Sequence, residues 1–316
     1  MTQQSLDVVT YGEALALFVA DEVGDFADVE KYTRRLAGAE TNVAIGLARL
    51  GLKVGWQSRV GNDSFGRFIC KRVAQEGVDV SHVATDMEFR TAIQLKAKAV
   101  GGADPAIEYY RKGSAASHLS PADFDETYFQ GARHLHATGI AAALSPSTMA
   151  FAHQALDFMR AKGKTISFDP NLRPMLWPSQ EVMVQQLNAL ACKADWVLPG
   201  LSEGKILTGY SAPNDIAAFY LEQGVKQVVI KLGAEGAYFR NADEEGIVAG
   251  VPVKEVVDTV GAGDGFAVGV ISALLEGLSI QQAVMRGNRI GAFAILVVGD
   301  MEGLPTRAQL DASLAA

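Results

Sequence analysis

One short segment, DTVGAGD at residues 258–264, has the residue types and the spacing for phosphoryl chemistry. Its glycines let the backbone turn sharply and approach a ligand without a clash with a Cβ atom. The apolar run that follows, from about residue 265 to 278, predicts a buried helix, and a helix N-terminus presents free N–H groups with a partial positive charge. The turn therefore predicts an anion hole for a phosphate, formed by Gly261, Ala262, Gly263 and Asp264.

Asp264 lies in the first turn of that predicted helix. A carboxylate does not attract a phosphate, so its presence at a phosphate site needs another explanation. We interpret it as a catalytic base that accepts a proton from a substrate hydroxyl while the neighbouring N–H groups stabilise the phosphoryl group in transfer. A plainer interpretation stays open, because a Gly-rich turn can simply join a strand to a helix and Asp is favoured at helix N-termini. The strand-like run KEVVDTV before the turn favours the phosphate interpretation.

Two other nucleotide signatures are missing from the sequence. It has no G-x-x-x-x-G-K-[ST] loop and no G-x-G-x-x-G after its first predicted strand. The pattern therefore argues against a P-loop enzyme and against a dinucleotide-binding protein.

The composition is that of a soluble globular protein. The 316 residues are 49% hydrophobic and 20% charged, with a formal net charge of −8, which argues against nucleic acid or an anionic membrane as partner. Two cysteines cannot form a disulfide framework, the N-terminus MTQQSLDVVTYGEA lacks the pattern of a signal peptide, and no apolar run reaches the roughly 20 residues of a membrane span. We expect a cytoplasmic location.

Short apolar runs alternate with helical patterns along most of the chain, which is typical of an α/β fold with a mostly parallel sheet covered by helices on both faces. The predicted strands are residues 7–12, 53–61, 132–140, 164–170, 194–200 and 226–233. The predicted helices are residues 42–50, 64–75, 145–162, 179–192, 216–223, about 265–278 and 279–298. Ligands of such sheets bind beyond the carboxyl ends of the strands, so the loops there should carry the chemistry.

Two stretches, at about residues 14–35 and 89–112, break this alternation. ALALFVAD and RTAIQLKAKAV alternate in polarity as antiparallel strands do. We predict a single domain, residues 1–316, with these stretches inserted as a small sheet that forms a lid. The exposed face of that sheet suits a contact between two copies of the chain, so we expect a homo-oligomer.

Three motifs in the same order resemble those of the ribokinase-like (PfkB) carbohydrate kinase family. Residues 258–264 resemble its second signature, and LAGAETN at 36–42 with the following VAIGLARLG resembles its N-terminal Gly-Gly-x-x-x-Asn segment. GNDSFG at 61–66 matches its V-G-x-D-x-x-G stretch, and the resemblance covers nearly the whole chain. Ala37 replaces the family's usual first Gly. The resemblance implies a three-layer fold and an ATP-dependent sugar kinase.

The resemblance also implies a nucleotide site that uses ATP and Mg²⁺. KLGAEG at 231–236 resembles a K-x-G-x-x-G loop, although it also suits a tight hairpin, and Asn288 matches a position near the adenine. Glu203 matches the Glu of an Asn-x-x-Glu motif that organises Mg²⁺ through water, with Gly200 in place of the Asn. The implied cofactor-binding residues are Lys231, Gly233, Gly236, Gly261, Gly263 and Asn288.

The substrate side resembles one branch of the family, the 2-keto-3-deoxygluconate kinases. YYRKGSAASHLSP at 109–121 and FDPNLRPMLW at 168–177 carry the likeness, and each holds an arginine, Arg111 and Arg173. A guanidinium binds a carboxylate in a forked geometry, so two of them suit a sugar acid better than a neutral sugar. An arginine taken alone is more often a partner in a surface ion pair, and the position of both in motifs that match the branch favours the ligand role.

By the same resemblance, Gly38 and Asn42 hold sugar hydroxyls and Tyr109 and Arg111 close over the sugar from the lid. Packing in the sheet is an equal explanation for one of Tyr109 and Tyr110, because alternation places them on opposite faces. Gln94 stands where the branch often has an aromatic residue in the lid strand.

The combined hypothesis is transfer of the γ-phosphoryl group of MgATP to the 6-hydroxyl of 2-keto-3-deoxygluconate, with Asp264 as base. One alternative is a kinase for fructose or another neutral sugar. A second, of another class, is a nucleotide-binding or sugar-binding sensor without activity, against which the presence of Asp264 argues.

Overall fold

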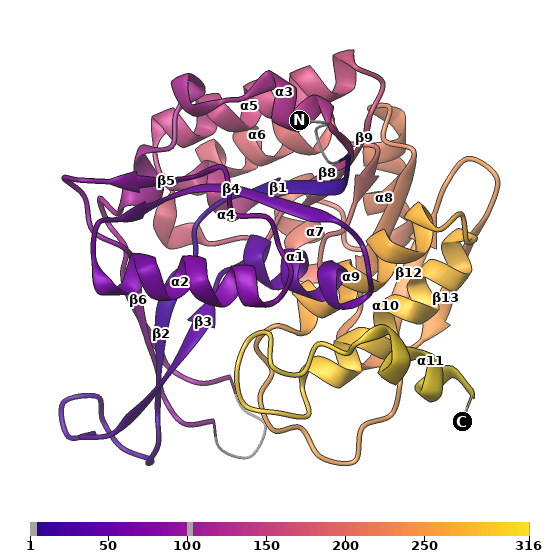
Figure 1. The fold of residues 1–316 in the computed structure, drawn as a ribbon. Coiled ribbons are helices and arrows are strands. Elements are labelled where there is room, and N and C mark those ends of the chain that lie inside the picture. The colour runs from indigo at the N-terminus through magenta and orange to yellow at the C-terminus, as the bar shows by residue number, and fades with distance from the viewer. Residues whose placement is uncertain (1–4, 100–103, 316) are drawn as a thin grey trace.

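A large, mostly parallel sheet forms the centre of the molecule (Figure 1). The computed structural model describes residues 5–99 and 104–315, and within them nine strands take the order β13-β12-β11-β10-β9-β8-β1-β4-β5. Neighbouring strands are parallel from β11 to β5, whereas β12 and β13 continue the sheet antiparallel. The strands are β1 (Leu6–Tyr11), β4 (Val54–Gly61), β5 (Val83–Asp86), β8 (Ala132–Thr138), β9 (Thr165–Asp169), β10 (Trp196–Val197), β11 (Gln227–Lys231), β12 (Gly236–Arg240) and β13 (Glu245–Ala249).

Helices cover both faces of this sheet, and each face has its own apolar core. One core contains α3 (Glu126–Gln130), α5 (Pro146–Ala161), α6 (Gln180–Ala191), α7 (Leu201–Thr208) and α8 (Pro213–Glu222), with α4 (Gly139–Ala143) at its edge. The other contains α1 (Ala39–Arg49), α2 (Ser64–Gln75), α9 (Ala262–Leu275), α10 (Ile280–Ala294) and α11 (Arg307–Ala315). Short 3₁₀ turns complete the chain at Ala115–His118, Pro121–Asp123, Pro174–Leu176 and Gly233–Glu235. The predicted three-layer α/β architecture is confirmed.

The helix that carries the predicted anion hole, α9, lies deep in the second core. Residues 265–273 of α9 are all buried, because the helix packs against both α1 and α10. A helix that is apolar on all sides is stable only inside the protein. The packing on α1 places the N-terminal end of α9 next to the first turns of α1.

A separate small sheet stands off the main body with the order β3-β2-β6-β7 (Figure 1). Its strands are β3 (Tyr32–Ala37), β2 (Leu15–Ala20), β6 (Ile93–Lys96) and β7 (Ile107–Tyr110). The expectation of antiparallel pairing holds for two pairs and is wrong for the third, since β2 and β6 run parallel. Residues 100–103 of the predicted lid segment lie outside the described residues.

The predicted contact between two copies of the chain would use the outer face of the small sheet. Tyr110 is 60% exposed, whereas Tyr109 faces the main body, as the predicted alternation requires. The homo-oligomer stays a prediction. Within the described part of the chain, no helix has the length and apolarity to cross a bilayer.

One predicted strand is wrong. KEVVDTV at 254–260 has no regular secondary structure, although its β-branched residues favour a strand. The N–H of Val257 donates instead to the carbonyl of Ile295 at 2.9 Å, just beyond α10, so this segment follows the helix layer rather than a sheet edge. The next residue, Asp258, turns its carboxylate into the protein interior. The segment that leads into the anion-hole turn is therefore a loop and not a strand.

Candidate active site

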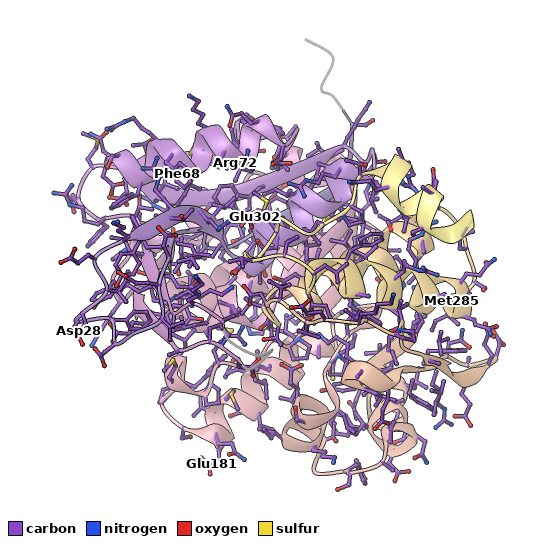
Figure 2. The ribbon with its side chains drawn as sticks, turned by 90° about the horizontal axis from the view of Figure 1, so that it is seen from below. Asp28, Phe68, Arg72, Glu181, Met285 and Glu302 are labelled. Atoms are coloured by element: carbon purple, nitrogen blue, oxygen red, sulfur yellow. The ribbon has the colours of Figure 1, made fainter. Side chains whose placement is uncertain are left out.

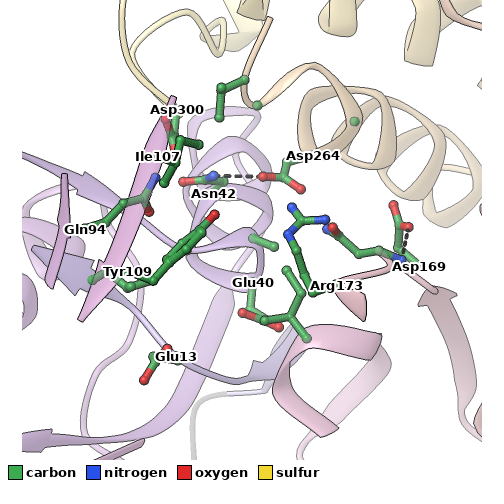
Figure 3. A pocket seen from close by; sticks show the side chains of 18 of the residues that line it. Glu13, Glu40, Asn42, Gln94, Ile107, Tyr109, Asp169, Arg173, Asp264 and Asp300 are labelled. Carbon is green, nitrogen blue, oxygen red and sulfur yellow. Dashed lines mark hydrogen bonds between the residues drawn. The ribbon is translucent and has the colours of Figure 1, made fainter. Parts of the chain in front are cut away.

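A polar cleft of about 290 Å³ opens between the small sheet and the carboxyl ends of the large sheet's strands (Figure 3). This is the edge of a parallel sheet at which ligands bind. Most of the residues predicted for substrate, phosphate or metal line this single cleft. They are Gly38, Asn42, Tyr109, Arg111, Arg173, Glu203, Lys231, Gly261, Gly263 and Asp264.

Asp264 faces this cleft from the first turn of α9 (Figure 3). Its Oδ2 accepts a hydrogen bond of 2.8 Å from Nδ2 of Asn42, in the first turns of α1. Two residues 222 positions apart are therefore brought together by the packing of α1 on α9. The arrangement leaves one carboxylate oxygen of Asp264 to meet a substrate hydroxyl.

The surroundings of Asp264 raise its pKa to about 7. Burial is the largest cause, and the carboxylates of Asp169 and Asp300 act in the same direction, while Asn42 and Lys231 act in the other. A carboxylate with an ordinary pKa is a weak base at neutral pH. A pKa near 7 is the value expected of a general base that works at neutral pH.

The turn before Asp264 has the geometry of an anion hole. Gly261 caps α9 in the left-handed conformation, with φ +84°, and a Cβ atom there would lie 2.2 Å from the carbonyl oxygen of Asp300. The first helical hydrogen bond runs from the N–H of Gly265 to the carbonyl of Gly261 at 2.8 Å. The N–H groups of Ala262, Gly263 and Asp264 precede it and are the free donors of a helix N-terminus.

Lys231 supplies a positive charge beside this turn. Its ammonium bonds Oδ2 of Asp169 at 2.6 Å, and a Cβ atom built on Gly263 would lie 3.7 Å from it. Burial alone would lower the pKa of Lys231, but the carboxylates of Asp169 and Glu203 outweigh burial and raise that pKa. The amine therefore stays charged where an incoming phosphate needs a cation.

The other predicted nucleotide residues lie outside the cleft. Gly233 and Gly236, both with positive φ, form the turn of a β11–β12 hairpin, so the hairpin interpretation is confirmed. Asn288 donates from its amide to the carbonyls of Val248 and Ala249 at 3.1 and 3.0 Å, joining α10 to β13. Their contact with a nucleotide stays a prediction.

Gly38 and the small sheet shape the sugar side of the cleft. Gly38 has φ +144°, and a Cβ atom there would lie 2.6 Å from the carbonyl oxygen of Glu13. Gln94 and Tyr109 stand directly opposite each other on β6 and β7 and both face the cleft (Figure 3). The polar amide that departs from the family pattern therefore lies next to the predicted sugar site.

The two arginines predicted to bind the substrate carboxylate differ in their surroundings. Arg111 is buried and its guanidinium pairs with the buried Glu13, with distances of 2.6 and 2.7 Å to Oε2. Arg173 makes no ion pair with any residue that the structure describes, and its guanidinium points into the cleft (Figure 3). The free charge is therefore that of Arg173, and a role of Arg111 toward the substrate stays a prediction.

Glu203 fixes the loop that carries Arg173. Its two carboxylate oxygens accept from the N–H groups of Leu172 and Gly200, at 2.8 and 2.6 Å. Asn171 in the same loop has φ +42°, a left-handed conformation that Asn tolerates better than most residues. Each oxygen of Glu203 has a second lone pair that can accept from water, and the metal role of Glu203 remains a prediction.

Sequence reasoning missed five acidic groups of the cleft: Glu13, Glu40, Asp104, Asp169 and Asp300. Glu40 is fully buried and accepts from Oγ1 of Thr138, and burial, the largest cause, raises its pKa to about 7. Glu13 and Asp169 each follow or end a buried strand of the parallel sheet, a signal that could have identified them. Nothing local in the sequence marks Asp300.

A second pocket, more apolar and about 450 Å³, lies at the far end of the anion-hole loop. It is lined by Val251, Pro252, Val253, Lys254, Glu255, Val257, Arg289, Ala292, Phe293 and Leu296. Residues 251–261 thus border both pockets, and Asn288 precedes one of the lining residues on α10. Sequence reasoning placed only Asn288 in this region.

Known proteins resemble the chain along almost its whole length. The family model described as pfkB family carbohydrate kinase matches residues 5–307. The 2-dehydro-3-deoxygluconokinase of Bacillus subtilis (strain 168) is 54% identical over 312 residues, which are 98% of this chain and 96% of that protein.

Solved structures agree with the sequence relatives. The crystal structure of a PfkB protein from Polaromonas sp. JS666 has 55% sequence identity and a TM-score of 0.90, covering 97% of this chain and 99% of that one. A putative ribokinase II from E. coli, solved in complex with ATP and Mg²⁺, has 29% identity and a TM-score of 0.90, covering 98% and 99%. The predicted ribokinase-like fold is confirmed.

Proposed function

The chain belongs to the pfkB family of carbohydrate kinases, and we propose that it phosphorylates a sugar acid, 2-keto-3-deoxygluconate, at its terminal hydroxyl. The observation that carries this substrate class is the unpaired guanidinium of Arg173, which points into a cleft whose other two cations, Arg111 and Lys231, are paired with carboxylates. Such a cleft repels an anionic sugar unless one cation is reserved for its carboxylate. The likeness to the Bacillus subtilis 2-dehydro-3-deoxygluconokinase, an enzyme named for the same sugar, supports the choice.

The reaction follows from the positions of these side chains. The sugar lies between Gly38, Asn42 and the small sheet, with its carboxylate at Arg173 and its terminal hydroxyl at Asp264. Asp264 accepts the hydroxyl proton as the oxygen bonds to the γ-phosphorus, and the bond from that phosphorus to the leaving ADP oxygen breaks. The N–H groups of residues 262–264 and the ammonium of Lys231 stabilise the charge that develops on the phosphoryl oxygens.

The nucleotide fits the same geometry. The anion-hole turn and Lys231 suit its terminal phosphates, and the apolar pocket at residues 251–257 and 289–296 suits the adenine. Bound Mg²⁺ would neutralise charge on the β- and γ-phosphates. Glu203, which faces the cleft, is the residue we propose to hold a water of that ion.

A neutral-sugar kinase of the same family is the second candidate. The observation that favours it is the pairing of Arg111 with Glu13, which leaves one free arginine rather than two in the cleft. A phosphorylation screen that compares 2-keto-3-deoxygluconate with fructose and ribose separates the two candidates. Higher kcat/KM for a neutral ketose would overturn the sugar-acid proposal.

Replacing Arg173 with Ala should lower kcat/KM for 2-keto-3-deoxygluconate by about 10- to 100-fold, because a charge-assisted hydrogen bond to the substrate carboxylate is lost. Activity on a neutral ketose should change little, since such a substrate has no carboxylate. The exposed Arg160 of α5 gives the matched control Arg160→Ala, which should behave as wild type. Equal losses for acid and neutral sugars would contradict the role of Arg173.

The pH dependence of kcat/KM should show one ionisation near pH 7, with activity lost as the pH falls. The pKa of Asp264 is raised to about 7 by burial and by Asp169 and Asp300, so below that pH the base is protonated and cannot accept a proton. Glu40, whose pKa is also about 7, is the rival source of the ionisation. The loss of kcat/KM at low pH should persist in the Glu40→Gln variant. If it disappeared in that variant, the ionisation would belong to Glu40.

A further inference from the structure

Lys96, the last residue of β6, buries its ammonium completely. The Nζ atom lies 2.6 Å from Oδ2 of Asp258 and 3.0 Å from Oδ1 of Asp300. A lysine is almost never fully buried unless its charge is paired, and removing one partner of a buried pair is strongly unfavourable. This cluster therefore holds its three segments together at a considerable desolvation cost.

Both carboxylates of the cluster belong to segments that shape the anion-hole turn. Asp258 lies three residues before Gly261, and its two oxygens also accept from the N–H groups of Val260 and Gly299, each at 3.2 Å. The carbonyl of Asp300 packs against Gly261, where a Cβ atom would come within 2.2 Å of it. The ammonium of Lys96 thus joins the two backbone segments, around Asp258 and Asp300, that pack against the turn.

The cluster also sets the charge behind the phosphate site. One ammonium faces two carboxylates, and Asp300 lines the cleft itself. The pKa of Asp300 is raised, because burial outweighs the lowering effect of the Lys96 ammonium. Without that ammonium, two uncompensated carboxylates would stand beside the site that must receive the phosphates of ATP.

The same strand reaches the sugar side. Gln94, two residues before Lys96, points from the same face of β6 into the cleft (Figure 3). A second link joins the small sheet to the Asp300 segment, since Arg35 of β3 pairs with Glu302 at 3.1 Å. Figure 2 labels Glu302. The small sheet is therefore tied to the loop behind the anion hole as well as to the substrate pocket.

We propose that Lys96 is a positioning residue whose ammonium acts as a built-in cation behind the phosphate-binding turn. It holds residues 258–261 and 299–300 in the conformation that presents the N–H groups of α9 to the phosphates. A small monovalent cation can occupy the space left when the side chain is removed. The readout by turnover rests on the proposed function, whereas the readout by nucleotide affinity does not.

Three variants test the role of this cation. Lys96→Ala removes the amine and leaves space, Lys96→Met removes the charge and fills the space, and Lys98→Ala removes an exposed lysine whose Nζ bonds only the carbonyl of Asp21 among the described residues. Assays in tetramethylammonium buffer, with KCl or NH₄Cl added at constant ionic strength, measure kcat and KM. Calorimetry measures MgADP affinity in the same buffers without sugar.

Wild type and Lys98→Ala should not respond to K⁺ or NH₄⁺. Lys96→Ala should lose about 100-fold in kcat and regain much of it with NH₄⁺ or K⁺, because displacement of the turn misaligns the reacting groups. Lys96→Met should stay impaired at any cation concentration. The MgADP affinity of Lys96→Ala should fall and recover in parallel with its kcat. A wild type that binds nucleotide but does not phosphorylate the sugar acid would refute the proposed function and leave the role of Lys96 testable by MgADP affinity.

Three results would overturn the proposal. They are a wild-type kcat that rises severalfold with K⁺ or NH₄⁺, a Lys96→Met variant as active as wild type, and a folded Lys96→Ala variant that neither cation restores. If neither variant folds, the wild-type titration decides, since indifference to both cations supports a built-in cation and stimulation contradicts it.

Discussion

Replacement of Asp264 with Asn should lower kcat by about 10³-fold while MgATP affinity stays close to that of wild type. The amide keeps the size of the side chain, and its oxygen can still accept the hydrogen bond from Asn42, so the anion hole is preserved. What disappears is the ability to accept a proton from the sugar hydroxyl. Steady-state kinetics with 2-keto-3-deoxygluconate and calorimetry with a non-hydrolysable ATP analogue measure the two effects separately.

The same substitution should stabilise the protein at alkaline pH. The pKa of Asp264 in the folded state, about 7, lies above its ordinary value of 3.8, so the charged carboxylate opposes folding above pH 7. That cost shrinks as the pH falls from 7 toward 3.8, because the folded protein then binds the proton. The Asn variant should therefore have a higher Tm than wild type at pH 8 and a smaller advantage at pH 5.

The exposed Asp243 provides the control, since Asp243→Asn removes a solvated carboxylate and should change neither kcat nor the pH dependence of Tm. An Asp264→Asn variant that keeps wild-type kcat would remove the base from the mechanism. Loss of nucleotide binding along with turnover would instead assign Asp264 a part in forming the anion hole.

Local patterns were enough to predict the central strands β1, β4, β8, β9, β10 and β11 and the helices α1, α2, α5, α6, α8, α9 and α10, but not β5, β13 or the helices α3, α4, α7 and α11. Strands such as Leu6–Tyr11 and Thr165–Asp169 are short, apolar and buried on both faces, and the helices between them repeat apolar residues with helical spacing. The same logic failed at residues 254–260, where a β-branched run is held by the carbonyl of Ile295 and by the buried Lys96. A tertiary contact there decides the conformation, and no local signal reports it.

The candidate site also has a part that local sequence predicts and a part that depends on tertiary contacts. Asp264 and Gly261 were predicted because the turn and the helix that follows it are contiguous in sequence. The pairing of Arg111 with Glu13, 98 positions apart, was not predicted, and neither was the contact between Lys96 and Asp300, 204 positions apart. Both depend on how the small sheet seats on the main body, so the sequence showed which residue types were present but not which charges were already paired.

Replacement of Gly261 with Ala should lower kcat/KM for MgATP more than 100-fold, because the backbone that forms the anion hole must move. Its φ of +84° disfavours any L side chain, and an added Cβ atom would lie 2.2 Å from the carbonyl oxygen of Asp300. That carbonyl belongs to the segment fixed by Lys96, so neither side can yield without displacing the N–H groups of residues 262–264. Kinetics with varied MgATP and calorimetric MgADP affinity measure the loss.

Gly277, just beyond the C-terminal end of the same helix, provides a closely matched control. Its φ is +81°, but an added Cβ atom would meet nothing within 4 Å. Gly277→Ala should therefore carry the conformational cost alone, about 1–2 kcal/mol of stability, with normal kcat/KM. If both alanine variants lost activity equally, general destabilisation would explain the effect, whereas a loss confined to Gly261→Ala locates it in the close approach of Asp300 to the phosphate-binding turn.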